Sequence, residues 1–409
     1  MSNVTSGASA RVTQRAGVWQ AVLLLAGSCM PVLGSVLITP VLPQLSEHFA
    51  GFPGAEVLVP MIVAIPALMI AIFAPFAGQV VDRLGRKPLL IIAMFAYALV
   101  GTAPAWLEAL PAILVSRVLV GVCEAAIMTV CTALIIDYFH EERRRDKYLG
   151  LQTVTTTLAA TVFIIVGGAL GVGGWHTPFW VYALSLVIVV PMIFSLWEPK
   201  PADSGEERVS AEKVRTPWRR IWVRLLVGLF AGFTFYVLII EVSYLVVGTG
   251  IDAGNTAAIG AVAAVASLFT AFGGLTFARL GKIGAVRLLP YAFALQALGM
   301  IIVWIVPALA GVIIGAVIAG FGSGLLLPSL VVWVVAPSRF AERGRVTGWW
   351  TAAFFFGQFL TPILMGGLAA ATGQLAVAVG VVGVAAAVMA VVLALVQRRV
   401  AVQEAADAV

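Results

Sequence analysis

The chain has 409 residues, of which 61% are hydrophobic and 11% are charged, and its mean hydropathy is +1.06. Soluble proteins are closer to half apolar and a quarter charged, so this composition excludes an ordinary soluble enzyme as well as a disordered chain. The net charge is +6, and three cysteines with three scattered histidines offer neither a disulfide framework nor a cluster of metal ligands.

Twelve apolar stretches follow one another along the chain. A helix needs about 20 apolar residues to cross a hydrocarbon core of roughly 30 Å, and lipid satisfies no backbone polar group, so we expect each stretch to be a helix. The stretches cover residues 19–43, 57–80, 88–107, 110–137, 149–172, 178–197, 221–247, 256–278, 284–306, 308–335, 347–371 and 375–397. The sequence therefore predicts an all-α membrane protein with twelve transmembrane helices.

A polar stretch at residues 198–220 is the longest in the chain and divides the spans six and six. We predict a cytoplasmic linker there. The remaining predicted parts are an N-terminal tail at 1–17, a six-helix bundle at 18–197, a second bundle at 221–398 and a C-terminal tail at 399–409.

The basic residues gather in alternate loops. With both termini on one side, 24 of the 25 lysines and arginines lie on that side, and the last, Arg117, lies inside a span. The opposite loops carry Glu47, Glu56, Glu108 and Asp252. Lysine and arginine mark cytoplasmic loops, so we expect a multi-pass protein of the inner (plasma) membrane with both termini cytoplasmic. The charges sit in short separate loops, so we expect no nucleic-acid partner.

The two halves repeat each other. The segment from Gly78 to Lys87 follows the second span, and the segment from Gly274 to Lys282 follows the eighth with the same spacing, although Ala278 replaces Asp82. Parallel repeats of six spans are typical of transporters whose binding site lies at the midplane between the halves.

These segments carry a family resemblance. The run from Gly78 to Lys87 resembles the signature between the second and third helices of the major facilitator superfamily, at Gly78, Asp82, Arg83, Gly85, Arg86 and Lys87. The pair Arg117/Gly121 resembles a second motif of the superfamily. The pair Gly167/Gly168 is similar to a motif of its drug/proton antiporters, although Phe163-Ile164 stand where those carry Gly-Pro. The tract from Arg117 to Ala125 also resembles spinster-type lipid transporters. The resemblance implies the major facilitator fold, two pseudo-symmetric halves, alternating access and a monomer.

The signature residues form a candidate cytoplasmic gating motif, to which Arg279 adds the copy in the second half. An acid at position 82 is placed to face the N-terminus of a neighbouring helix or to pair with a loop arginine. Such contacts form only when the halves close on that side, so they bias one conformer. The alternative is that the basic loop only fixes topology.

Arg117 and Glu124 are the candidate proton-coupling residues. They are seven residues apart, so they lie on one face of the fourth span, about 10 Å apart along its axis. We expect them to share one water-filled cavity, where a carboxyl group takes up and releases a proton as its exposure changes. The alternative is a permanently protonated Glu124 bonded to a backbone carbonyl.

Four residues form the candidate substrate-binding or outer-gate set: Glu241, Arg117, Tyr236 and Trp333. Glu241 and Arg117 lie at similar depths, and the resemblance places spans 1, 4, 7 and 10 around the cavity. We expect the two to approach when the outer gate shuts, or Glu241 to attract a cationic substrate. The threonines of 153–157 are expected to bond to their own helix, and Gln358 is expected outside the cavity.

No Walker-A pattern, dinucleotide fingerprint or catalytic triad occurs, so we expect neither an enzyme nor a cofactor, and a proton gradient as energy source. The predicted function is a secondary transporter that exports small amphiphilic organic compounds in exchange for protons. Its partners would be the substrate, protons and membrane lipid. One alternative is proton-coupled uptake of a small metabolite or organic acid, with Arg117 holding a carboxylate. Another is a lipid-handling or sensor membrane protein.

Overall fold

The computed structural model describes residues 16–199, 218–281, 284–339 and 342–407, except for the side chains of Gly78, Val80, Asp82, Ala278 and residues after 398. Twelve helices in this part of the chain are long and apolar enough to cross a membrane. The described residues contain no strand. The predicted all-α fold and the count of twelve spans are confirmed.

The first half contains six spans, and several of them are made of more than one element. Its elements are α1 Val18–Ser28, α2 Met30–Val36, η1 Thr39–Val41, α3 Leu42–His48, α4 Ala55–Phe73, η2 Ala74–Phe76, α5 Ala77–Leu84, α6 Arg86–Thr102, η3 Ala103–Ala105, α7 Leu110–Tyr138, α8 Glu142–Gly171, η4 Thr177–Ala183 and α9 Leu184–Ser195. The first span is interrupted where Pro31, Pro40 and Pro43 begin new turns, because proline lacks the N–H that would continue the helix.

The second half is more regular. Its elements are α10 Trp218–Gly248, α11 Thr256–Leu280, α12 Ala285–Ile305, α13 Leu309–Val335, α14 Arg343–Thr372 and α15 Leu375–Asp407. Helix α10 begins at Trp218, so the last three residues of the predicted linker are helical, and residues 200–217 lie outside the described part. Helix α8 begins seven residues before the expected 149, because its first turns are polar and continue the helix beyond the apolar stretch.

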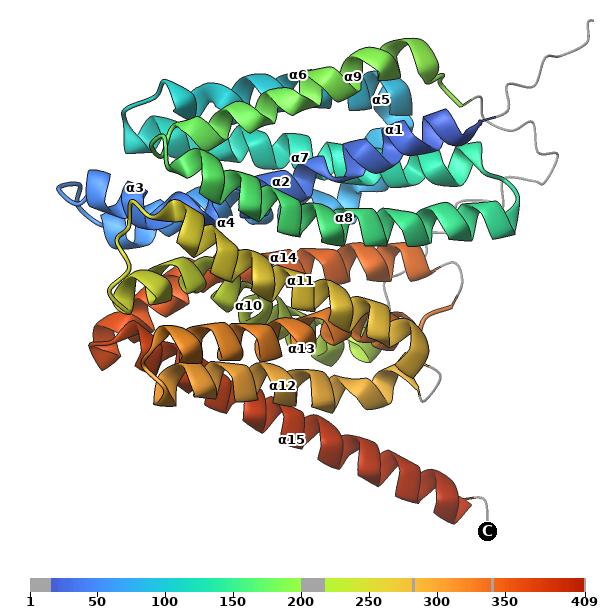
Figure 1. The fold of residues 1–409 in the computed structure, drawn as a ribbon. Helices are drawn as coiled ribbons and strands as arrows, with labels where there is room; N and C mark the ends of the chain where they lie inside the picture. Colours follow the sequence, from blue (N-terminus) through green and yellow to red (C-terminus); the bar gives the residue numbers. More distant parts are fainter. Residues whose placement is uncertain (1–15, 200–217, 282–283, 340–341, 408–409) are drawn as a thin grey trace, which may run out of the picture.

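The halves lie side by side in Figure 1, α1–α9 above and α10–α15 below, and they pack through α8 against α11 and α4 against α14. The loops near Glu47, Glu56, Glu108 and Asp252 share one end of the molecule, which we call the acidic end; it lies at the left of Figure 1. The opposite end carries the segments 83–87, 143–147, 219–224, 279 and 343–345, and we call it the basic end.

Close backbone contact joins the halves toward the acidic end. A Cβ atom on Gly168 of α8 would lie 2.7 Å from the carbonyl oxygen of Thr256, and one on Gly260 of α11 would lie 2.9 Å from the Cα atom of Gly168. The Thr256 hydroxyl donates to the Gly168 carbonyl at 2.7 Å, and the Ser243 hydroxyl donates to the Thr39 carbonyl at 2.7 Å. Glycines permit this approach because they carry no side chain. The halves are therefore in close contact at this end.

At the basic end, one cluster ties three helices of the first half together. Gly85 has φ of +81°, a conformation that glycine adopts without strain, and α6 starts immediately after it. The Glu198 carboxylate, which follows α9, accepts hydrogen bonds from the backbone N–H groups of Arg86 at 2.8 Å and Lys87 at 2.7 Å. The Arg86 guanidinium pairs with Asp137 at the end of α7. The second half carries alanine at the first position of α12, where α6 has Arg86.

Candidate functional site

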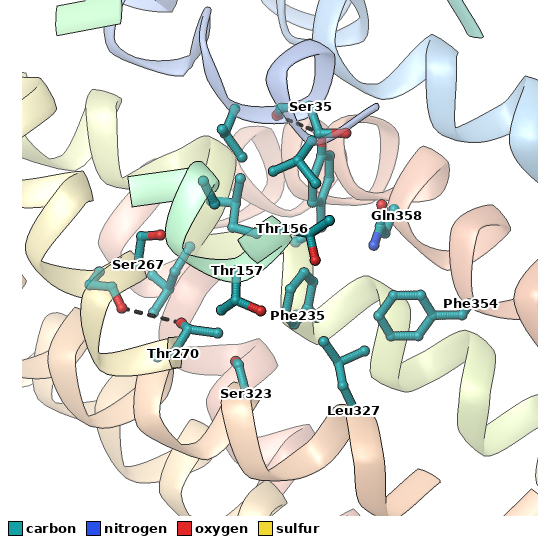
Figure 2. Close-up of a pocket in the computed structure, with 18 of the residues that line it drawn as sticks. Ser35, Thr156, Thr157, Phe235, Ser267, Thr270, Ser323, Leu327, Phe354 and Gln358 are labelled. Carbon is teal, nitrogen blue, oxygen red and sulfur yellow. Dashed lines mark hydrogen bonds between the residues drawn. The ribbon is translucent and has the colours of Figure 1, made fainter. Parts of the chain in front are cut away.

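A cavity of about 470 Å³ lies between the halves, within the range of small-molecule sites. It is lined by α1, α2, α4, α7 and α8 of the first half and by α10, α11, α12, α13 and α14 of the second. Figure 2 shows Thr156, Thr157 and Phe235 near the centre of the view, Ser267 and Thr270 at the left and Phe354 at the right. A site built by both halves is one that changes shape when the halves move.

The lining of the cavity is apolar with scattered hydroxyl and amide groups. Among the described residues that line it, none is Asp, Glu, Lys, Arg or His. The apolar part includes Phe235, Phe354, Phe355, Trp350 and several aliphatic side chains. Aromatic and aliphatic surface of this kind binds organic cargo by removing it from water, whereas a fully charged group finds no counter-charge.

Tyr236 is the one predicted substrate-contact residue that lines the cavity. Its side chain leaves α10 and crosses to the first half, where its hydroxyl lies 3.2 Å from the carbonyl oxygens of both Ser35 and Val63. The ring is almost completely buried. Tyr236 therefore forms part of the cavity wall and at the same time fastens the two halves at mid-membrane.

Sequence reasoning missed several lining residues. Gln358 of α14, expected outside the cavity, lines it, and so do Thr153, Thr156 and Thr157 of α8. The threonine hydroxyls do bond to their own helix, as expected, but this does not prevent them from facing the cavity. The spacing 153, 156, 157 and 160 marks one face of a helix, and that polar face in an otherwise apolar span was the available signal.

Arg117 lies inside the first half, away from the cavity. It is fully buried, and its guanidinium donates to the Tyr182 hydroxyl at 3.0 Å and to the carbonyls of Val100 and Gly101 at 3.1 Å each. The guanidinium carbon also lies 5.1 Å from the centre of the Tyr182 ring. These partners come from η4 and α6, so the expected placement of Arg117 in the water-filled cavity is corrected.

Glu124 is also fully buried, and it does not line the cavity. Both of its carboxyl oxygens lack a hydrogen-bond partner. The carboxyl group packs on Gly34 of α2, where a Cβ atom would collide with it, beside the Tyr97 hydroxyl. Tyr97 itself donates to the Met30 carbonyl at 2.5 Å, and its ring lies 5.1 Å from that of Tyr182. A carboxyl group without a partner at such depth is rare in proteins and calls for a functional reason.

Glu241 and Trp333 do not line the cavity either. Glu241 is buried in α10, and no described residue forms a hydrogen bond or ion pair with it. Trp333 lies near the basic end, where its carbonyl accepts from Arg224 at 2.6 Å and its ring faces the same guanidinium at 5.2 Å. The Arg117 donors are taken up inside the first half, so Arg117 does not pair with Glu241 in this conformer.

The candidate gating motif lies at the basic end. Arg86 and Lys87 are held by Asp137 and Glu198, while Arg83 and Arg279 are exposed. The Lys87 ammonium donates to the carbonyls of Ile193 and Leu196, at 2.8 and 2.6 Å. Gly78 and Asp82 belong to α5, but their side-chain environment lies outside the described part of the chain. The role of the motif as a gate stays a prediction.

Comparison with known proteins is consistent with this architecture. The sequence profile of the Major Facilitator Superfamily matches residues 23–254 and 225–408. The class B tetracycline resistance protein of Escherichia coli is 28% identical over 196 residues, 48% of either chain, so the match spans about half the length of that relative. The 3-(3-hydroxy-phenyl)propionate transporter of Escherichia coli K12 is 29% identical over 344 residues, 81% of this chain and 83% of that one.

A solved structure with a similar fold is a bacterial homologue of the human lysosomal transporter Spinster, in an inward-facing and occupied conformation. The TM-score is 0.71 at 17% sequence identity, and the match covers 93% of this chain and 97% of that one.

Proposed function

The chain belongs to the major facilitator superfamily of secondary transporters, and from that premise we propose that it exports small amphiphilic organic compounds in exchange for protons. The observation that carries the proposal is the cavity between the halves, lined by both of them, together with the close contact of the halves at the acidic end. When two bundles lose their contacts at one end and form contacts at the other, the site between them opens to one side of the membrane and then to the other.

The charge pattern supports an orientation. Lysine and arginine favour the cytoplasmic side, so we place the basic end in the cytoplasm. In this conformer the halves are then in close contact toward the outside, which is the state in which an exporter takes up its cargo from the cell. The mainly apolar lining suits cargo that dissolves poorly in water.

Glu124 is the proposed proton carrier. Its carboxyl group has no partner in this conformer and lies against Gly34, one residue from Ser35, whose carbonyl binds Tyr236 of the cavity wall. Movement of the first span relative to α10 therefore changes the surroundings of Glu124 and of the cavity together. We assign Arg117 a positioning role, because it holds Tyr182 against the Tyr97 ring.

The test uses everted membrane vesicles that contain the full chain and are energised by respiration. A panel of drugs, phenols and small organic acids is added, and lumenal pH is followed with a fluorescent dye. We expect cargo to release protons from the lumen of wild-type vesicles and labelled cargo to accumulate inside. Glu124→Gln should abolish proton release. The control is Gln296→Met, which replaces a buried amide side chain in the second half and should preserve proton release. Equal proton release by wild type and Glu124→Gln would overturn the assignment.

Uptake of an organic acid by proton symport is the second candidate. A relative that matches 81% of this chain supports an organic-acid cargo, because it is named as a phenylpropionate transporter. The same vesicles separate the two directions. An exporter accumulates external cargo against its gradient, whereas an uptake symporter empties preloaded vesicles while the lumen loses protons. Emptying without accumulation would replace export by uptake.

A further inference from the structure

Nearly all of the hydroxyl groups that line the cavity already use their hydrogen in a hydrogen bond within the protein. Ten of them donate to acceptors within the protein, and the exception is Ser267, which accepts from Thr161 at 3.0 Å. The ten donors are Ser28, Ser35, Thr132, Thr153, Thr156, Thr157, Thr234, Tyr236, Thr270 and Ser323.

The hydroxyl bonds of the lining threonines on α8 are intrahelical, and two of them are short. Thr156 donates to the Gln152 carbonyl at 2.8 Å, and Thr157 donates to the Thr153 carbonyl at 2.7 Å. A hydroxyl has one hydrogen and two lone pairs, so a threonine whose hydrogen is used in this way presents only an acceptor to the cavity. Turning the hydrogen toward cargo would break the hydroxyl's bond to the helix, so donation to cargo comes only at the cost of that bond.

The amide groups extend the same pattern. Gln152 uses its NH₂ group to donate to Ser28 at 2.8 Å and to Thr132 at 3.0 Å. The Trp350 indole N–H has no hydrogen-bond partner, but it is buried beside Gly228 of α10 and is not exposed to the cavity. The Gln358 amide, seen beside the cavity in Figure 2, makes no hydrogen bond to a described residue and is therefore a donor that remains for cargo, together with Ser267.

From this inventory we propose that the cargo is an uncharged molecule that donates hydrogen bonds, such as a phenol or an alcohol on an aromatic frame, and that carboxylates are rejected. The inference rests on the proposed function, because it takes the cavity as the transport site. Acceptor oxygens on Thr156, Thr157 and Thr270 repel a carboxylate, and the lining offers no cation to offset the loss of its hydration. An acceptor-only cargo can use only the Gln358 amide and Ser267, and it leaves the threonine oxygens of the wall without a donor.

The experiment compares three probes on one biphenyl frame: 4-phenylphenol, its methyl ether 4-methoxybiphenyl, and biphenyl-4-carboxylate. Binding to the full chain in lipid nanodiscs is measured by equilibrium dialysis, and partition into empty nanodiscs is subtracted. We expect the phenol to bind about tenfold more tightly than the ether, which is the effect of one hydrogen bond. The carboxylate should show no binding above the empty nanodiscs.

Matched variants identify the wall oxygens responsible. Thr156→Val with Thr157→Val keeps the shape of the wall but removes two acceptors, so the preference for the phenol over the ether should fall to near parity. Thr155→Val is the control. Thr155 makes the same kind of bond to its own helix, to Leu151 at 2.9 Å, but does not line the cavity. The tenfold preference should persist in this variant.

Two further variants fill the cavity with one new side chain from each half, Ala160→Phe on α8 and Ala266→Phe on α11, and both should abolish phenol binding. If phenol and ether bind equally and both are blocked by these changes, the donor preference is overturned while the cavity stands as the transport site. Tighter binding of the carboxylate, or no binding of the phenol, also overturns the preference. Phenol binding that survives both filled variants overturns the site and the preference together.

Discussion

Equivalent positions of the two halves hold different polar chemistry. Gly34 and Thr234 are each the seventeenth residue of their spans, Tyr97 and Gln296 each the twelfth, and Glu124 and Ser323 each the fifteenth. In the second half the three side chains form a series of hydrogen bonds that ends on a backbone carbonyl. Thr234 donates to Gln296 at 3.0 Å, Gln296 donates to Ser323 at 2.8 Å, and Ser323 donates to the Ala319 carbonyl at 2.9 Å.

The first half puts an ionisable group where the second half has a satisfied hydroxyl. Glu124 has no hydrogen bond, and the room for its carboxyl group exists because position 34 is glycine. A cluster in which every donor has an acceptor is rigid, whereas a carboxyl group without a partner responds to any change around it. The difference indicates that proton coupling is confined to the first half and that the second half serves as a fixed counterpart.

The largest expected effect comes from replacing Gly34 with threonine, the residue at the equivalent position of the second half. Gly34→Thr places a side chain where the Glu124 carboxyl group lies, so we expect loss of cargo-driven proton release and a destabilisation of about 1–3 kcal/mol from overpacking. Proton release is measured in everted vesicles and stability by thermal unfolding in detergent. Adding Glu124→Ser should restore stability without restoring proton release. A fully coupled Gly34→Thr protein would contradict the comparison.

Arg117 has no basic counterpart at the matching position of the second half, where α13 carries Ala316. Arg117→Lys keeps the charge, but a single ammonium cannot serve Tyr182 and the carbonyls of Val100 and Gly101 in the same geometry. We expect a loss of about 2 kcal/mol, because acceptors are left buried without donors. Thermal unfolding measures the loss. An unchanged melting temperature would mean that these bonds contribute nothing.

Gln296→Met tests the second half by removing the central amide while keeping its volume. Thr234 loses the amide acceptor but still has the Ala231 carbonyl at 3.2 Å, so we expect a loss of about 1 kcal/mol. Cargo-driven proton release should match wild type, since the comparison assigns no proton to this cluster. Loss of proton release in this variant, with normal amounts of protein in the membrane, would show that both halves take part in coupling.

Glu198→Gln gives the smallest effect. The amide retains one acceptor oxygen at the start of α6, so one of the bonds to Arg86 and Lys87 is lost with the negative charge. We expect a loss of about 1 kcal/mol or less, which should shrink further in high salt because the site is exposed. Melting temperature at two salt concentrations measures it. A larger loss than that of Arg117→Lys would mean that the exposed cluster at the basic end stabilises the first half more than its buried guanidinium does.

Most of the fold was predictable because lipid imposes a strict length on apolar runs. Twelve such runs predicted twelve spans, and the polar stretch near 198–220 indicated the division into halves. The internal breaks of the first span were harder to place. Pro31, Pro40 and Pro43 each begin a short helical segment, but a proline in an apolar run is equally compatible with one kinked helix.

The site was predicted only in part. Helical periodicity shows which residues share a face of one helix, but it does not show which neighbouring helix or cavity that face contacts. Arg117 and Glu124 are both buried in the first half, consistent with their spacing, yet they face α2, α6 and η4 instead of the cavity. Gln358 was missed because its span was not expected to reach the cavity. Trp333 was misplaced because aromatic side chains near helix ends serve several purposes.

The backbone contact at Gly168 and Gly260 has a consequence for how the transporter responds to temperature. Residues that interlock with long side chains gain rotamer freedom when they separate, which favours the separated form as temperature rises. Glycines gain none, so opening this part of the seam releases little side-chain entropy. The balance between the two conformers then depends mainly on a few hydrogen bonds, such as those of Thr256 and Ser243, and on cargo. The response of the two conformers to temperature is then set by the enthalpy of those few bonds and not by side-chain entropy.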